Sequence, residues 1–307
     1  MSEGYGYGKV ILFNEHFVVH EIPAIASAIE KKTIANVDDS KTEGFTLSDD
    51  RPETPGYKKE KSSQQKDSLD RIFKAMKIDE EKVRMELSGD LLAATGLGAS
   101  AASCTAIARA LSNHFKLGYK DEKINDVAYE GEKGYHGTPS GIDNTASTFG
   151  GLIWFKRGKQ NVIEKLKIKA PVEIVIGNTG LVADTSAAVA GVRERKEKNP
   201  KKYEKIFKEA ESLVYDAKEA LGSYEIEKVG KLMDENHRLL CDIGVSCEEL
   251  DMLVEIARKN GAIGAKLTGG GLGGNMVALT PGKDLQEKVA KAIEDKGFGV
   301  IRTRIGV

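Results

Sequence analysis

A glycine-rich run that ends in hydroxyl side chains is the first part of this chain that could do chemistry. Residues 95–103 read TGLGASAAS, and a helical pattern begins at about Ser100. Glycine lets a backbone turn tightly and expose its N–H groups, and a helix N-terminus adds unpaired N–H groups and the positive end of the helix dipole. The run lacks both a Walker A Lys-Ser/Thr pair and a G-x-G-x-x-G pattern. It predicts an anion site of another kind, and a tight helix entry without a ligand is the alternative.

A second segment carries two carboxylates. Glu132 falls near the end of a predicted helix over 125–135, and Asp143 follows the sequence Pro139-Ser140-Gly141. Proline and glycine force a turn there, so we expect Ser140 and Asp143 on a loop. A hydroxyl, a carboxylate and phosphate oxygens are the hard ligands that Mg²⁺ prefers. Ser100 and Glu132 are therefore candidate magnesium ligands, with a helix N-cap and a solvated glutamate as the plainer alternatives.

A second glycine run lies near the C-terminus. Five of the six residues 269–274 are glycine, directly after Lys266-Leu267-Thr268. Each glycine weakens regular structure by about 1 kcal/mol relative to alanine. The flanking apolar residues are typical of buried strands, so the run favours a loop that lets a backbone approach closely. A flexible linker is the alternative.

Together with Gly8–His16 (GKVILFNEH), these segments resemble the GHMP kinase superfamily, and within it the mevalonate kinases. The helix entry is similar to the family motif P-x-x-x-G-L-G-S-S-A-A, and the C-terminal run to K-L-T-G-A-G-G-G-G. Residues 132–144 are similar to the E-x-x-x-H-G-x-P-S-G-x-D-N segment of mevalonate kinases. Residues 189–193, 236–240, 244–246 and 250–251 also resemble that branch. The likeness runs nearly end to end.

The resemblance implies an α+β fold: the two-domain GHMP kinase fold, with the active site in the interdomain cleft. We expect an N-terminal domain over 1–170, with the phosphate loop and catalytic residues, and a C-terminal domain over 171–307, with the second glycine run. The implied reaction is ATP- and Mg²⁺-dependent phosphorylation of the primary hydroxyl of mevalonate, giving 5-phosphomevalonate and ADP for isoprenoid biosynthesis. Relatives are often dimers, which implies a homodimer.

The resemblance also assigns roles to individual residues. Asp143 is the candidate base for the substrate hydroxyl, and Lys9 would stabilise its charge and that of the reacting oxygen. Ser100 and Glu132 match the magnesium-binding positions. The expected contacts to ATP phosphates are Gly96, Leu97, Gly98, Ala99, Ser100 and Ala101. The expected contacts to substrate are Glu15, His16, Ser140, Asp143, Thr268 and Gly269.

Four positions depart from the family pattern and bear on the choice of substrate. Asn14 and Leu272 each replace a glycine, and Ala99 replaces a serine. Ser186 stands in the triplet Asp184-Thr185-Ser186 where many relatives carry a lysine or arginine. Another GHMP kinase, acting on phosphomevalonate, homoserine or a sugar, and a catalytically silent metabolite-binding homologue are therefore the alternative functions.

Composition limits the remaining classes. The 307 residues include 46 basic and 47 acidic side chains, and this balance gives no nucleic-acid footprint and disfavours an RNA-binding protein. No apolar run is long enough to span a bilayer. Three cysteines without zinc spacing are typical of reduced thiols in a cytoplasmic protein. The periodicity predicts an α+β N-terminal half with a polar surface excursion over 38–66, then a mainly helical stretch over 185–259.

Overall fold

Two groups of segments form the fold, and neither is continuous in sequence. The computed structural model describes residues 1–52, 57–79, 82–92, 96–183 and 185–307. The first unit contains Met1–Lys9 and Ala28–Gly150, and the second contains Val10–Ser27 and Gly151–Val307. The chain thus passes from the first unit to the second directly after Lys9 and returns at Ala28. The division into family domains near residue 170 stays a prediction.

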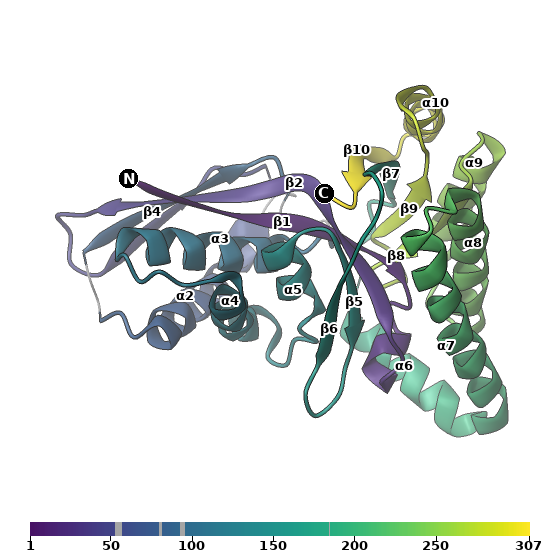
Figure 1. Cartoon of the computed structure of the whole chain (residues 1–307), viewed down its shortest axis with the longest axis horizontal. Coiled ribbons are helices and arrows are strands. Elements are labelled where there is room, and N and C mark those ends of the chain that lie inside the picture. Colours follow the sequence, from purple (N-terminus) through teal and green to yellow (C-terminus); the bar gives the residue numbers. More distant parts are fainter. Residues whose placement is uncertain (53–56, 80–81, 93–95, 184) are drawn as a thin grey trace. The chain divides into compact units, whose positions relative to one another are not determined.

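The first unit is a sheet with helices packed against it (Figure 1). Its strands are β1 (Ser2–Phe13), β2 (Ala24–Asp39), β3 (Phe45–Asp49) and β4 (Val83–Gly89). The last residues of β1, from Val10, and the first residues of β2, up to Ser27, belong to the second unit. Strand β4 pairs antiparallel with β2 and parallel with β3. The helices are α1 (Tyr57–Glu60), α2 (Ser62–Met76), α3 (Ala99–His114), α4 (Asp121–His136) and α5 (Ile142–Phe149).

Small residues let α3 lie directly on β1. A Cβ atom on Gly4 would lie 2.3 Å from the carbonyl oxygen of Ala106, and one on Gly6 would lie 2.2 Å from that of Ala102. Side chains of β2, β4, α2, α3 and α4 fill the core beneath. The alanine-rich sequence of α3 is therefore a packing requirement, and it fixes the helix whose N-terminus carries the glycine-rich run.

The second unit has an antiparallel sheet in the order β10-β7-β9-β8. Its strands are β5 (Leu152–Lys156), β6 (Val162–Leu166), β7 (Val172–Asn178), β8 (Gly264–Thr268), β9 (Asn275–Leu279) and β10 (Gly299–Ile305). Its helices are the 3₁₀ turn η1 (Phe17–His20), α6 (Thr185–Lys198), α7 (Pro200–Gly222), α8 (Ile226–Asp242), α9 (Glu248–Lys259) and α10 (Lys283–Glu294). Strand β5 pairs with the first residues of β2 and with β6.

The structure corrects two sequence-based expectations. The polar stretch 38–66 includes β3, which is held by its parallel pairing with β4, together with α1 and the start of α2. Part of that stretch, residues 53–56, lies outside the described residues. Asp143 lies in the first turn of α5 and not on a loop, because Gly141 in the left-handed conformation (φ 91°) begins a helix there. None of the helices in the described ranges is both long and apolar enough to cross a membrane.

Candidate active site

The glycine-rich run forms the entry to α3 in the first unit. Gly96 and Gly98 both have positive φ angles, 71° and 74°, and Gly98 precedes the first helical residue. A Cβ atom on Gly98 would lie only 2.8 Å from Cγ of Lys9, so no other residue fits between the run and that side chain. The first N–H groups of α3, from Ala99 onward, have no acceptor within the helix. The backbone thus has the turn and the helix start on which the predicted anion site depends, and anion binding there stays a prediction; Thr95 lies outside the described residues.

Lys9 brings a buried cation to the same place. Its backbone N–H donates to the carbonyl of Leu97 (2.9 Å), and its Nζ lies 3.2 Å from Oδ1 of Asp143. Lys9 is only 4% exposed, whereas the Asp143 side chain is one-third exposed. The carboxylate is therefore held by a buried ammonium group and stays accessible from solvent. The pairing expected between these two residues is present.

Glu132 and Ser100 come from two separate helices, as predicted. Glu132 on α4 is 1% exposed, and burial together with the charge of Asp143 raises its pKa to about 8, although the Ser100 hydroxyl and Lys9 oppose the shift. His136, a residue that the sequence analysis did not select, contacts both: its Nε2 lies 3.2 Å from Ser100 Oγ and 3.9 Å from Glu132 Oε2. A bound divalent cation would favour the ionised carboxylate, and this hydroxyl–carboxylate set is one that Mg²⁺ accepts.

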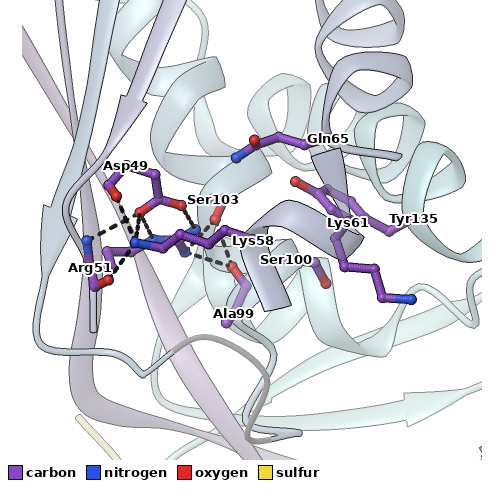
Figure 2. A pocket seen from close by; sticks show the side chains of 9 residues that line it. All are labelled: Asp49, Arg51, Lys58, Lys61, Gln65, Ala99, Ser100, Ser103 and Tyr135. Carbon is purple, nitrogen blue, oxygen red and sulfur yellow. Dashed lines mark hydrogen bonds and ion pairs between the residues drawn. The ribbon is translucent and has the colours of Figure 1, made fainter. Parts of the chain in front are cut away.

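A pocket adjoins the start of α3 (Figure 2). Its lining includes three basic side chains that the sequence analysis did not select, Arg51, Lys58 and Lys61. Arg51, Lys58 and Asp49 lie on one side of it, and Lys61 and Tyr135 on the opposite side. No motif marks Arg51, Lys58 and Lys61, because they lie in the polar stretch that gave no periodic signal.

The second unit gathers Glu15 and His16 with the C-terminal glycine run. Glu15 forms an ion pair with Lys266, and both side chains are almost completely buried. Burial lowers the pKa of Lys266, and the Glu15 charge opposes that shift. His16, 3% exposed, places Nε2 2.8 Å from the carbonyl oxygen of Gly270. Burial lowers the pKa of His16 to about 4, so its ring is neutral near pH 7.

The tautomer of His16 follows from its neighbour. A carbonyl oxygen only accepts, so Nε2 carries the proton and Nδ1 carries the lone pair. Within the described residues Nδ1 is buried and has no partner. His16 therefore offers an acceptor at Nδ1, because its Nε2 proton is already donated to Gly270. Thr268, in contrast, uses its hydroxyl within the fold: it accepts from the N–H of Ile11 and donates to the carbonyl of the same residue, both at 3.0 Å.

The glycine run is needed for close packing. A Cβ atom on Gly270 would lie 2.2 Å from Thr185 Oγ1, and one on Gly271 would lie 2.2 Å from the carbonyl oxygen of Val245. Gly269 has a φ of 90°. Leu272 has a positive φ (54°), a conformation that glycine adopts readily, and is 42% exposed. The run is thus a folded loop and not a flexible linker.

The other departures from the family pattern also have structural explanations. Asn14 adopts a φ of 71° and is buried, and its amide donates to the carbonyls of Pro23 (2.9 Å) and Ala210 (3.0 Å). Asn236 bonds to Asn14 in return. The turn that places Glu15 and His16 is therefore held without glycine. Ser186 is exposed on α6, and Asp184 lies outside the described residues.

His237, which shares the α8 motif with Asn236, belongs to a hydrogen-bonded network. The N–H of Leu267 points to its Nδ1 (3.3 Å), and its Nε2 lies 3.3 Å from Oδ1 of Asp251. Because Nδ1 accepts, Nε2 carries the proton that faces the carboxylate. Ser246 donates to the same carboxylate oxygen (2.5 Å). The network ties β8, α8 and the start of α9 together, directly behind the strand that leads into the glycine run.

Comparison with known families agrees with both halves of this arrangement. The model of the GHMP kinases N terminal domain matches residues 66–151, and that of the GHMP kinases C terminal domain matches residues 217–298. The chain belongs to the GHMP kinase family.

Within the family the chain is similar to mevalonate kinases. It is 36% identical to the mevalonate kinase of Pyrococcus horikoshii, over 97% of this chain and 93% of the relative. It is 32% identical to that of Methanothermobacter thermautotrophicus, over 89% and 88%. A crystal structure of L. major mevalonate kinase in complex with R-mevalonate superposes with a TM-score of 0.95 at 36% identity, covering 99% of this chain and 96% of that one.

Proposed function

We propose that this GHMP kinase transfers the terminal phosphoryl group of ATP to the primary hydroxyl of mevalonate, giving 5-phosphomevalonate and ADP. The observation that carries the proposal is the Lys9–Asp143 pair, a buried ammonium and an accessible carboxylate 3.2 Å apart beside the N-terminus of α3. The similarity to mevalonate kinases supports the choice of alcohol. The product would serve isoprenoid biosynthesis.

The first unit supplies the contacts for ATP. The N–H groups at residues 96–101 would hold the phosphates, as the N-terminus of a helix does for anions. Ser100 and Glu132 would hold Mg²⁺, with His136 orienting the Ser100 hydroxyl. When bound, the cation would neutralise charge on the phosphate oxygens. The adjoining pocket, with Lys58 and Lys61 on its lining, would take the rest of the nucleotide.

Asp143 and Lys9 would act on the alcohol. Phosphoryl transfer requires an oriented hydroxyl more than covalent help from the protein. The Asp143 carboxylate would accept the hydroxyl proton, or a hydrogen bond from it, as attack begins. Lys9 would stabilise the negative charge of the carboxylate and of the attacking oxygen. Ser140, two residues before α5, is a proposed substrate contact and uses its oxygen weakly in the fold, accepting from the Ile142 N–H at 3.4 Å.

In the second unit, Glu15, His16, Thr268 and Gly269 are the proposed substrate contacts. The buried lone pair on Nδ1 of His16 would accept a hydrogen bond from a substrate hydroxyl. A buried acceptor left without a donor costs about 1–3 kcal/mol. Substrates without a hydroxyl at that place should therefore be rejected. The Thr268 hydroxyl already donates to Ile11, so its contribution would be limited to its remaining lone pair.

A substrate panel tests the proposal. Purified protein with ATP and Mg²⁺ is assayed by coupled ADP detection on mevalonate, phosphomevalonate, homoserine and galactose. We expect kcat/KM for mevalonate to exceed the others by several powers of ten, since unpaired buried polar groups discriminate strongly. Faster turnover of another alcohol would overturn the choice of substrate and keep the kinase class. No turnover of any alcohol, with ATP binding intact, would favour a silent metabolite-binding homologue.

Two further proposals come from the family resemblance. We propose that the protein is a homodimer in solution, which light scattering coupled to gel filtration measures. We also propose a cytoplasmic location, without membrane or nucleic-acid partners, which cell fractionation tests. The near-equal numbers of basic and acidic side chains support the absence of a nucleic-acid partner.

A further inference from the structure

A buried arginine lies beside the phosphate loop and has no part in the reaction described above. Arg51 follows β3 and is 6% exposed. Its Nε donates to Oδ1 of Asp49 (2.9 Å) and its Nη2 to Oδ2 (2.6 Å), the two-pronged arrangement that gives the strongest arginine–carboxylate pairs. Although burial opposes it, Arg51 holds the pKa of Asp49 below its usual value. The pair is thus charged and fixed in orientation.

The third nitrogen of Arg51 reaches the first turns of α3. Nη1 donates to Ser103 Oγ (2.6 Å) and to the carbonyl oxygen of Ala99 (3.3 Å), and it also contacts Thr33 Oγ1 (3.2 Å). Ser103 Oγ in turn donates to the Ala99 carbonyl (2.7 Å). Ala99 and Ser103 lie on either side of Ser100 in the sequence. Arg51 therefore holds the turn of the helix whose N–H groups and hydroxyl form the anion site.

Lys58 fixes the segment that carries Arg51. Its Nζ donates to the carbonyls of Asp49 and of Arg51, both at 2.6 Å, and lies 3.5 Å from Oδ1 of Asp49 (Figure 2). We call these three residues the Asp49–Arg51–Lys58 cluster. Its two cations, Arg51 and Lys58, lie beside the N-terminus of α3, the positive end of the helix dipole.

Cations destabilise the N-terminus of a helix and anions stabilise it. Arg51 and Lys58 both line the pocket beside this end of α3, and Arg51 contacts its first turn. An anion bound there would be attracted both by the helix dipole and by these two side chains.

We propose that Arg51 is a positioning residue for the nucleotide: it sets the first turn of α3 so that the N–H groups and the Ser100 hydroxyl meet the phosphates of ATP. Asp49 and Lys58 hold Arg51 in place, and Ser103 transmits its contact to the helix. This inference rests on the proposed ATP site. Arg51 itself does not touch the nucleotide in this assignment, because all three of its nitrogens are used within the protein.

Three variants and one control test the assignment. Arg51→Met removes the charge and the paired hydrogen bonds to Asp49. Arg51→Lys keeps the charge without the paired hydrogen bonds, and Ser103→Ala removes the hydrogen bond between Arg51 and the Ser103 hydroxyl on α3. Arg71→Met is the control: Arg71 lies on α2 in the same unit and pairs with Asp67 on the surface. ADP affinity is measured by calorimetry, kcat and KM by the coupled assay, and folding by thermal unfolding.

We expect Arg51→Met to weaken ADP binding at least tenfold and to lower kcat/KM for ATP about 30-fold, with KM for mevalonate within threefold of the parent. Arg51→Lys should recover only part of the loss, and Ser103→Ala should weaken ADP binding about threefold to tenfold. The control should match the parent. A folded Arg51→Met protein with parental ADP affinity would overturn the inference, whatever its melting temperature.

The outcome stays decisive if Arg51→Met does not fold. Arg51→Lys and Ser103→Ala then carry the test, and parental ADP affinity in both would overturn the inference. The calorimetry also separates this inference from the proposed function. A parent protein that binds ADP but does not phosphorylate mevalonate contradicts the proposed substrate and leaves the comparison of Arg51 variants valid. A parent that binds no ADP contradicts both.

Discussion

Replacing Asp143 with asparagine tests the centre of the proposed mechanism. Asn keeps the shape of the side chain and removes both the charge and the ability to accept a proton. A general base is typically worth about 10²–10⁴ in rate, or about 3–5 kcal/mol of barrier. We therefore expect kcat to fall at least about 100-fold in Asp143→Asn, while KM for mevalonate and for ATP change by less than about fivefold.

The same substitution also removes the ion pair with Lys9, and this should change the stability of the fold separately from turnover. Two unit charges 3.2 Å apart attract by about 5 kcal/mol at an effective dielectric constant of about 20, before the cost of dehydration. The Asp143 side chain is one-third exposed, so solvent screening and hydration reduce the net value well below this figure. Lys9 would nonetheless be left buried and uncompensated, and a lower melting temperature should accompany the loss of turnover.

The assay has to separate chemistry from folding. Steady-state kinetics with coupled ADP detection are run at a temperature where thermal unfolding shows the variant fully folded. Asp126→Asn is the matched control, because Asp126 is an exposed carboxylate on α4 of the same unit. If Asp143→Asn retains more than a tenth of parental kcat while the control is unaffected, Asp143 has no catalytic role and the reasoning from the Lys9 pair fails.

Three other perturbations have defined outcomes. Ser100→Ala and Glu132→Gln should each raise the Mg²⁺ concentration needed for half-maximal activity by about tenfold or more, since each removes one proposed oxygen ligand; magnesium titrations that overlay the parent's contradict the assignment. His16→Ala should raise KM for mevalonate at least about tenfold and leave KM for ATP within about threefold, because it removes the buried acceptor at Nδ1; equal changes in both constants would point to a general loss of structure. Acid should destabilise the fold through His16 and His237, whose pKa values are lowered to about 4 by burial, because the unfolded chain takes up protons below pH 6.5 and the folded chain does not. Each histidine should lower the free energy of unfolding by about 2 kcal/mol at pH 5 relative to pH 7. If the free energy of unfolding in urea depends on pH as strongly in His237→Gln as in the parent, the contribution of His237 is refuted.

The proposed catalytic and metal-binding residues could be selected from the sequence. Lys9, Ser100, Glu132 and Asp143 each stand next to a glycine or proline signal, or on a strongly periodic helix. The glycines at 96 and 98 are required by local backbone geometry, and local geometry is what sequence reports most directly. The long helices α7 and α8 also follow from periodicity, because each buries one apolar face.

The elements that carry no local signal were missed. Strand β6 is exposed along most of its length, so it has no alternation to detect. Strand β3 lies in a polar stretch, and its pairing with β4 joins segments about 38 residues apart in sequence. Helix α5 is only eight residues long and follows a Pro-Ser-Gly turn, which favoured a loop. In each case a partner distant in the chain supplies the stabilisation that the segment lacks by itself.

The sequence by itself determined which residues could perform phosphoryl transfer, because glycine turns, helix starts and isolated carboxylates are local properties. Only the tertiary structure decided how those residues are charged and held. The pKa of Glu132 depends on burial and on Asp143, and the tautomer of His16 depends on the carbonyl of Gly270. Arg51 reaches Ala99 of α3 from a position 48 residues earlier in the chain. Burial and charge–charge contacts are set by neighbours in space, and spacing along the chain does not report them.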